Sequence, residues 1–233
     1  IFNLYIPDTG VEHKKLHKNP LYLFQEFNRC MILLWRDRLG QVSLAVTTLF
    51  WGAGATLQFI VIKWAEAALH LNLSKSSMLQ GVVAIGVALG AAAAAKMVTL
   101  RQSVRVIPIG IAMGIIVLSM VFVRTLWVAV PLLIVIGALS GFFVVPMNAL
   151  LQHRGHLLMG AGHSIAVQNF NENLSVLVTT CLYYLMMQIN LSIYWVITLF
   201  GLFVSGSMLL VKRRHEHNQR IQDDVIHLDD STH

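Results

Sequence analysis

Long apolar runs dominate this chain and predict an all-α, polytopic membrane protein. A helix needs about 20 mostly apolar residues to cross the hydrocarbon core of a bilayer, and six stretches satisfy that condition. They are 43–69, 77–99, 104–123, 126–150, 164–187 and 191–211. The connections between them are so short that neighbouring helices must run antiparallel. We therefore expect a compact bundle of six transmembrane helices.

The composition excludes an ordinary soluble domain. Of the 233 residues, 56% are hydrophobic and only 12% are charged, whereas a soluble domain has about 25% charged residues. The net charge of +6 does not indicate a nucleic-acid partner, because the basic residues stand at the ends of apolar runs rather than in one patch. The two cysteines, Cys30 and Cys181, lie far apart. We expect no disulfide framework, no metal and no cofactor.

The positions of lysine and arginine predict the orientation, since cytoplasmic loops carry the excess of these residues. They precede the first predicted helix, separate the second from the third and the fourth from the fifth, and follow the sixth. The opposite side carries only Lys75 and Arg124. Both ends of this chain are therefore expected in the cytoplasm.

Three regions follow from the pattern: a cytoplasmic linker over 1–40, the six-helix bundle over 41–212, and a disordered cytoplasmic tail over 213–233. Within the linker, apolar residues between Leu23 and Trp35 recur at helical spacing beside Arg29 and Arg36. Such a helix either lies in the membrane interface or packs against the underside of the bundle.

Small residues four apart let membrane helices approach closely. The chain has three such glycine pairs, Gly86 with Gly90, Gly110 with Gly114, and Gly137 with Gly141. We interpret them as packing sites. Near the last pair, Pro146 and Asn148 predict a broken, partly polar half-helix, either as a hinge or as a packing kink.

Charged residues within a membrane are costly and mark functional sites by default. Glu172 lies in the fifth predicted helix, where the helical repeat places a polar stripe on one face. The stripe consists of Gln168, Asn169, Glu172 and Asn173. It either lines a water-accessible cavity or forms a hydrogen-bond network between helices. We favour the cavity, because four adjacent polar groups exceed what packing needs.

The first predicted helix holds the other intramembrane charges, Lys63 and Glu66, which are three apart and able to pair on its surface. A lysine near the membrane edge can also snorkel to the interface, so we interpret the pair first as an anchor and second as a substrate contact. Gln58 and Trp51 lie deeper in the same helix and are better placed for a central cavity.

Several runs of the chain resemble the bacterial lysophospholipid transporters of the major facilitator superfamily. The resemblance is carried by LFWGAG at 49–54, VAIG at 83–86, AAAKMVTL at 93–100, GFFVVPMNALLQ at 141–152, and GAG at 160–162 followed by AVQN at 166–169 and EN at 172–173. Residues 2–7 resemble the end of that family's sixth helix. The chain thus resembles the second half alone, helices seven to twelve, and its native start is expected upstream of Ile1.

The resemblance implies movement of lysophospholipids, chiefly lysophosphatidylethanolamine, from the outer to the inner leaflet of the bacterial inner membrane. A separate acyltransferase and acyl carrier protein ligase then restores the diacyl lipid. The polar stripe would meet the headgroup, on a path shared with Trp51, Gln58, Lys63 and Asn148. The resemblance also implies a basic residue where this chain has Gln58, so the phosphate would need another partner here. The site would lie between this half and the missing N-terminal six-helix half.

Two other functions use similar features. A transporter of the same superfamily for another amphipathic substrate, such as a drug, shares the fold and differs only in the site. An integral membrane lipid acyltransferase is the enzymatic alternative. Against it, no histidine of the chain is followed by an aspartate five positions on, and no nucleophile is paired with a base. We therefore predict a transporter rather than an enzyme.

Overall fold

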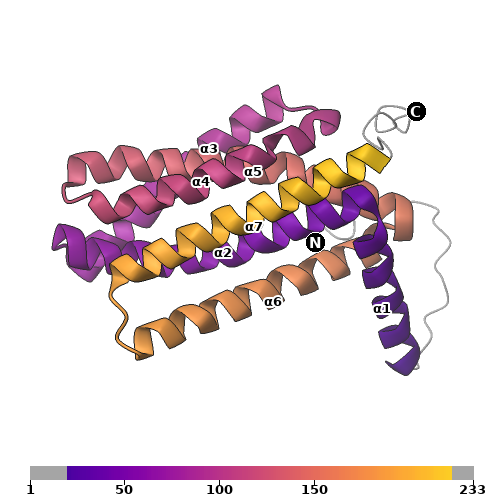
Figure 1. Cartoon of the computed structure of the whole chain (residues 1–233), viewed down its shortest axis with the longest axis horizontal. Helices are drawn as coiled ribbons and strands as arrows, with labels where there is room; N and C mark the ends of the chain where they lie inside the picture. The colour runs from indigo at the N-terminus through magenta and orange to yellow at the C-terminus, as the bar shows by residue number, and fades with distance from the viewer. Residues whose placement is uncertain (1–19, 222–233) are drawn as a thin grey trace, which may run out of the picture.

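The computed structural model describes residues 20–221, which form seven α-helices and two short 3₁₀ helices (Figure 1). The helices are α1 (Pro20–Arg36), α2 (Arg38–Leu69), α3 (Leu73–Met97), η2 (Leu100–Val106), α4 (Ile107–Ser119), η3 (Met120–Phe122), α5 (Leu126–Met159), α6 (Ala161–Gln188) and α7 (Ile193–Ile221). The predicted all-α class is confirmed. In this part of the chain the helices from α2 to α7 form one bundle.

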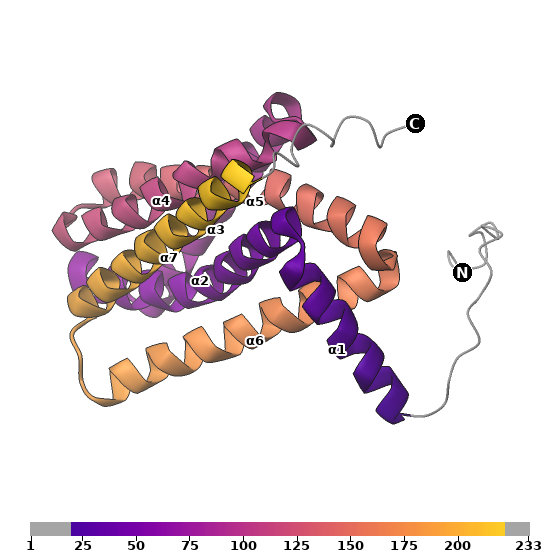
Figure 2. The ribbon, with the colours of Figure 1, turned by 45° about the vertical axis from the view of Figure 1, so that its right-hand side comes forward.

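The bundle has α2 and α7 at its centre. Figure 1 shows α3, α4 and α5 gathered on one side of these two helices and α6 on the other, with α1 running across one end. The view in Figure 2 agrees. The deepest side chains include Trp64 of α2, Ile136 and Phe143 of α5, and Val196 of α7. Trp64 also donates its indole Nε1–H to the Met120 carbonyl oxygen at 2.9 Å, which holds the end of the third predicted span against α2.

Five segments of the described residues are long and apolar enough to cross a membrane: Arg38–Leu69, Leu73–Met97, Leu100–Phe122, Leu126–Met159 and Ile193–Arg220. Five of the six predicted spans are thus confirmed by length and composition. The other segment, α6, forms the expected helix of 28 residues. Helix α6 is not apolar enough to count among these segments, because it carries the polar residues between Gln168 and Asn173. That α6 crosses the membrane therefore stays a prediction.

The predicted boundary of the tail is wrong. Helix α7 continues to Ile221, so residues 213–221 are helical rather than disordered, whereas 222–233 lie outside the described residues. The helix continues because its polar side chains bind the start of α2. Arg214 Nε donates to Gln41 Oε1 at 3.1 Å, and Asn218 Nδ2 donates to the Arg38 carbonyl oxygen at 3.3 Å. In the predicted linker, 1–19 also lie outside the described residues.

The glycine pairs have the packing role that the sequence predicts. Gly86 and Gly90 of α3 face the backbone of α5, and a Cβ at Gly90 would collide with the Ala138 carbonyl group. Gly137 and Gly141 of α5 meet the backbone of α3 in return. We call this contact the α3–α5 seam. In α4, Gly114 meets the backbone of α7 in the same way, whereas Gly110 makes room for the side chains of Met208 in α7 and Phe143 in α5.

Helix α5 is unbroken at Pro146, since it runs without interruption from Leu126 to Met159, whereas the hinge and the packing kink stay predictions. Proline removes one helical hydrogen bond, and here the ring is buried while the preceding turn is held in the α3–α5 seam. Tertiary packing therefore keeps the helix intact.

Candidate functional site

A cavity of about 890 Å³ lies between the helices of the bundle. Residues of α2, α3, α4, α5, α6 and α7 line it, and the exposed lining residues Trp51, Gln58 and Ala84 show that it opens between α2 and α3. Its volume is at the upper end of the range for small-molecule sites, about 300–1,000 Å³. The bundle therefore offers room for a sizeable ligand with access from the side.

The cavity wall is almost wholly apolar. Among residues 20–221 its polar groups are two carboxamides, one hydroxyl and one indole, and no charged side chain of this range lines it. The Ser140 hydroxyl already donates to the Ile136 carbonyl oxygen at 2.7 Å and lies 3.1 Å from the Met113 sulfur. The long middle section can thus hold an apolar chain but binds no charge.

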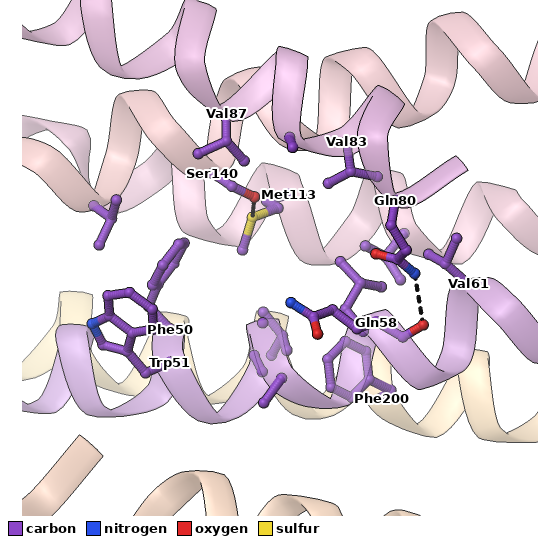
Figure 3. Close-up of a pocket in the computed structure, with 18 of the residues that line it drawn as sticks. Phe50, Trp51, Gln58, Val61, Gln80, Val83, Val87, Met113, Ser140 and Phe200 are labelled. Carbon is purple, nitrogen blue, oxygen red and sulfur yellow. Dashed lines mark hydrogen bonds between the residues drawn. The ribbon is translucent and has the colours of Figure 1, made fainter. Parts of the chain in front are cut away.

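One end of the cavity carries the two glutamines (Figure 3). Gln80 of α3 donates its Nε2–H to the Gln58 carbonyl oxygen at 2.8 Å, which joins α3 to α2. The Gln58 side chain extends from the opposite wall toward the same space. This end offers neutral hydrogen-bonding groups.

Trp51 lies at the other end of the cavity in Figure 3, beside Phe50. The two rings are 5.8 Å apart at an interplanar angle of 84°. Such an edge-to-face pair is a favourable aromatic geometry. The indole is 44% exposed, so it stands at the mouth of the cavity and not in the core.

A polar cluster lies next to the Trp51 end of the cavity. The Gln168 Nε2 group donates to Asn148 Oδ1 at 3.1 Å and to Glu172 Oε1 at 2.8 Å. Asn148 is four residues beyond the wall residue Val144 in α5, and Glu172 is four residues before the wall residue Val176 in α6. Four residues span about 6 Å of helix. The Asn148–Gln168–Glu172 cluster is therefore about one turn from the cavity wall, at the end of the bundle where α2 begins and α5 ends.

The structure divides the polar stripe. Gln168 is buried and Glu172 half-buried, whereas Asn169 and Asn173 are exposed on the outer surface of α6. The Asn173 side chain donates to the Asn169 carbonyl oxygen at 2.8 Å, within its own helix. The sequence places four residues on one face, but they cover a wide arc, and α5 contacts only one edge of it. The cluster itself is an interhelical hydrogen-bond network beside the cavity.

Lys63 and Glu66 form the pair that their spacing predicts, with Lys63 Nζ 3.1 Å from Glu66 Oε2. Their side chains are 53% and 30% exposed, and neither lines the cavity. The pair lies near the end of α2, on a side where Phe59 stacks on Tyr183 of α6 at 5.8 Å. This arrangement fits the anchoring interpretation.

Sequence reasoning missed one residue of the site and one contact that holds α2. Gln80 is an uncharged polar residue within the second apolar run, and a search for polar as well as charged residues in the predicted spans would have found it. Asp37 gave no such signal, because it precedes the apolar run. It caps α2 by accepting the Gly40 N–H at 2.6 Å and forms a two-contact ion pair with Arg154 of α5, in which Arg154 Nε donates to Asp37 Oδ1 at 3.1 Å.

The cavity and its polar ends suit an amphipathic ligand. The chain is 43% identical over 190 residues to lysophospholipid transporter LplT of Serratia proteamaculans, an alignment that covers 81% of this chain. The chain is thus similar to bacterial lysophospholipid transporters. It is 40% identical over 192 residues to the protein of that name from Pectobacterium carotovorum, with 82% of the chain covered. The Escherichia coli O9:H4 protein is 39% identical over 220 residues, 92% of the chain.

The resemblance to lysophospholipid transporters is thereby confirmed, and these relatives are named as transporters. The chain spans about half the length of these relatives, 48%, 47% and 55% in the same order. No protein-family model matches the chain, and no solved structure matches it. In the described residues no group of three or more histidine, cysteine, aspartate or glutamate side chains is placed to hold a metal ion.

Proposed function

We propose that this chain is part of a secondary transporter that moves lysophospholipids across a bacterial inner membrane. One observation carries the proposal: a relative of lysophospholipid transporters encloses a long apolar cavity with uncharged polar groups at one end and a polar cluster beyond the other. A lysophospholipid has one acyl chain and one polar headgroup. The apolar middle of the cavity suits the chain, and its polar ends suit the headgroup.

The proposed pathway uses the residues around the cavity. Gln168 and Glu172 would meet the headgroup near the cytoplasmic end, with Asn148 fixing the Gln168 carboxamide. The exposed Asn169 and Asn173 would extend the polar path on the outer face of α6. Trp51 and Gln58 would contact the substrate at the two ends of the cavity, and Lys63 would offer its ammonium group to a phosphate at the outer edge.

In more detail, we propose that this chain forms one half of a major facilitator bundle. It would have six spans, one of which is α6, and both ends of this chain would lie in the cytoplasm. Two observations support it. The chain covers about half of its relatives, and α6 fully buries only Ser164, Val167 and Gln168, while its remaining residues are half-buried or exposed. A polar helix with so little burial needs further protein in a membrane. The missing N-terminal six-helix half is the proposed partner, together with the surrounding membrane lipids.

The proposed substrate is chiefly lysophosphatidylethanolamine, carried from the outer to the inner leaflet, where an acyltransferase and acyl carrier protein ligase would restore the diacyl lipid. Without a charged side chain in its lining, the cavity suits a headgroup that carries no net charge. The function includes no chemical reaction on the lipid.

The test uses spheroplasts of a host that lacks its own transporter and expresses the chain completed with its upstream half. Labelled lysophosphatidylethanolamine and a labelled cationic drug are offered separately. Uptake of the lysolipid alone supports the proposal. Uptake of the drug alone would indicate a transporter of another amphipathic substrate. If the purified protein converts the lysolipid when it is given an acyl donor, the protein is an acyltransferase.

A further inference from the structure

Helix α1 has two apolar faces, and only one of them packs on the bundle. On the first face Cys30 and Leu34 are buried with Leu44, Leu151 and Val167 of the neighbouring helices. Phe27 meets Phe170 of α6 edge-on, with ring centroids 5.3 Å apart. This face fixes α1 to the bundle.

The opposite face of α1 exposes large apolar side chains at helical spacing. Leu21 is 67% exposed, Phe24 70%, Ile32 42% and Trp35 41%, and the helical repeat places all four on the side away from Cys30 and Leu34. Only Asn28 interrupts this apolar stripe. An exposed apolar surface of this kind marks a contact with a membrane or a partner.

Two arginines run along one edge of the stripe. Arg29 and Arg36 are seven residues apart, or about two helical turns, and both are exposed. Within residues 20–221 no ion pair engages either guanidinium. The one acidic residue of α1, Glu26, faces inward instead, with its Oε1 atom 3.6 Å from His163 Nε2 of α6. The outer surface of α1 is therefore apolar, and the two arginines lie between the stripe and the exposed side chains of Tyr22 and Leu33.

The direction of α1 matches a membrane surface. Figures 1 and 2 show α1 crossing the end of the bundle, whereas α2 to α7 run along it. If those helices cross the bilayer, α1 lies near its plane. Asp37 directly follows the C-terminal end of α1 and forms an ion pair with Arg154 of α5. Because basic side chains are enriched at the cytoplasmic surface of the membrane, this end of α1 lies at that surface.

We propose that α1 lies in the headgroup layer of the cytoplasmic leaflet, with the apolar stripe inserted toward the acyl chains and with Arg29 and Arg36 bound to anionic phospholipid headgroups. A helix with an apolar face and a basic polar edge binds membranes in this way. The proposal rests on the orientation given under Proposed function and is independent of the substrate. A membrane is favoured over a protein partner because the exposed charges of the outer surface are all positive, which complements an anionic lipid surface.

The first test places a nitroxide at position 32 by Ile32→Cys, in the completed protein with its native cysteines replaced, reconstituted in nanodiscs. Accessibility to oxygen, which partitions into lipid, is compared with accessibility to a water-soluble nickel chelate. Glu216→Cys on the exposed side of α7 gives the aqueous reference. High oxygen and low nickel accessibility is the expected result. High nickel accessibility places the stripe in water, and low accessibility to both shows that protein covers it; either result overturns the proposal.

The second test measures the lipid preference with a dye at position 28, introduced by Asn28→Cys. Quenching by brominated phosphatidylglycerol is compared with quenching by brominated phosphatidylcholine. One basic residue near an anionic surface contributes roughly fivefold to binding, so the double variant Arg29→Gln, Arg36→Gln should lose most of the preference for phosphatidylglycerol. The matched control Arg213→Gln, Arg220→Gln should keep it. Equal quenching by the two lipids in the unmodified protein would also overturn the proposal.

Discussion

The α3–α5 seam determines whether the cavity forms, because it brings Val87 and Val144 into the same wall. Gly90→Ala is the sharpest perturbation of this contact. The added Cβ would meet the Ala138 carbonyl carbon and oxygen, which belong to helical backbone and cannot rotate away as a side chain would. The two helices must therefore separate or shift.

Two opposing effects determine the magnitude. Replacing glycine by alanine within a helix stabilises the fold by about 0.5–1 kcal/mol, whereas overpacking costs about 1–3 kcal/mol. Since the obstruction at Gly90 is backbone, we expect the larger cost and a net loss of about 1–2 kcal/mol in the free energy of unfolding. Gly206→Ala in α7 is the matched control, because nothing lies within 4 Å of its added Cβ, and it should gain up to about 1 kcal/mol.

The assay is reversible unfolding of the completed protein in mixed micelles with increasing sodium dodecyl sulfate, followed by circular dichroism. The difference between the two variants isolates the collision, because both carry the same change in helix propensity. If Gly90→Ala unfolds at the same detergent fraction as Gly206→Ala, the result contradicts a close contact between the backbones of α3 and α5.

Two further predictions concern the contacts that hold α2. In a double-mutant cycle of Asp37→Ala and Arg154→Ala, we expect a coupling of about 1–3 kcal/mol in the free energy of unfolding. Asp37→Ala should cost about 1 kcal/mol more than Arg154→Ala, because it also removes the helix cap. Equal costs of the two single variants would contradict the capping role. Trp64→Phe keeps an aromatic ring in the core but removes the indole donor to the Met120 carbonyl oxygen, which then keeps only the Val123 N–H at 3.3 Å. Unfolding in the same micelles should become easier by about 0.5–1.5 kcal/mol, and an unchanged midpoint would refute the importance of that bond.

Hydropathy predicts most of this fold because a helix that crosses a membrane is predominantly apolar. All six apolar runs are helical, and the glycine pairs have the packing role that their spacing indicates. The end of α7 is different. Arg214 and Asn218 are polar and indicate a solvated tail, but their hydrogen bonds to α2 help to keep that segment helical. Such tertiary contacts leave no trace in a hydropathy pattern.

The candidate site could be predicted only in part. Trp51 and Gln58 line the cavity as expected from their depth in the first span. The polar stripe was identified, but its division into a buried edge at Gln168 and an exposed edge at Asn173 depends on which side of α6 meets α5. Helical periodicity gives the angle between two residues. It does not give the position of the neighbouring helix.

The most direct test of the proposed pathway compares Glu172→Ala with Glu216→Ala in the completed transporter. Glu216 is an exposed carboxylate of α7 beside Lys212, far along the chain from the cavity lining, so it controls for the loss of a negative charge. Uptake of labelled lysophosphatidylethanolamine by spheroplasts is measured at equal membrane abundance of the three proteins. We predict that the unmodified protein and Glu216→Ala take up the lipid and that Glu172→Ala does not. Uptake by Glu172→Ala at the unmodified rate would contradict a substrate pathway through the Asn148–Gln168–Glu172 cluster.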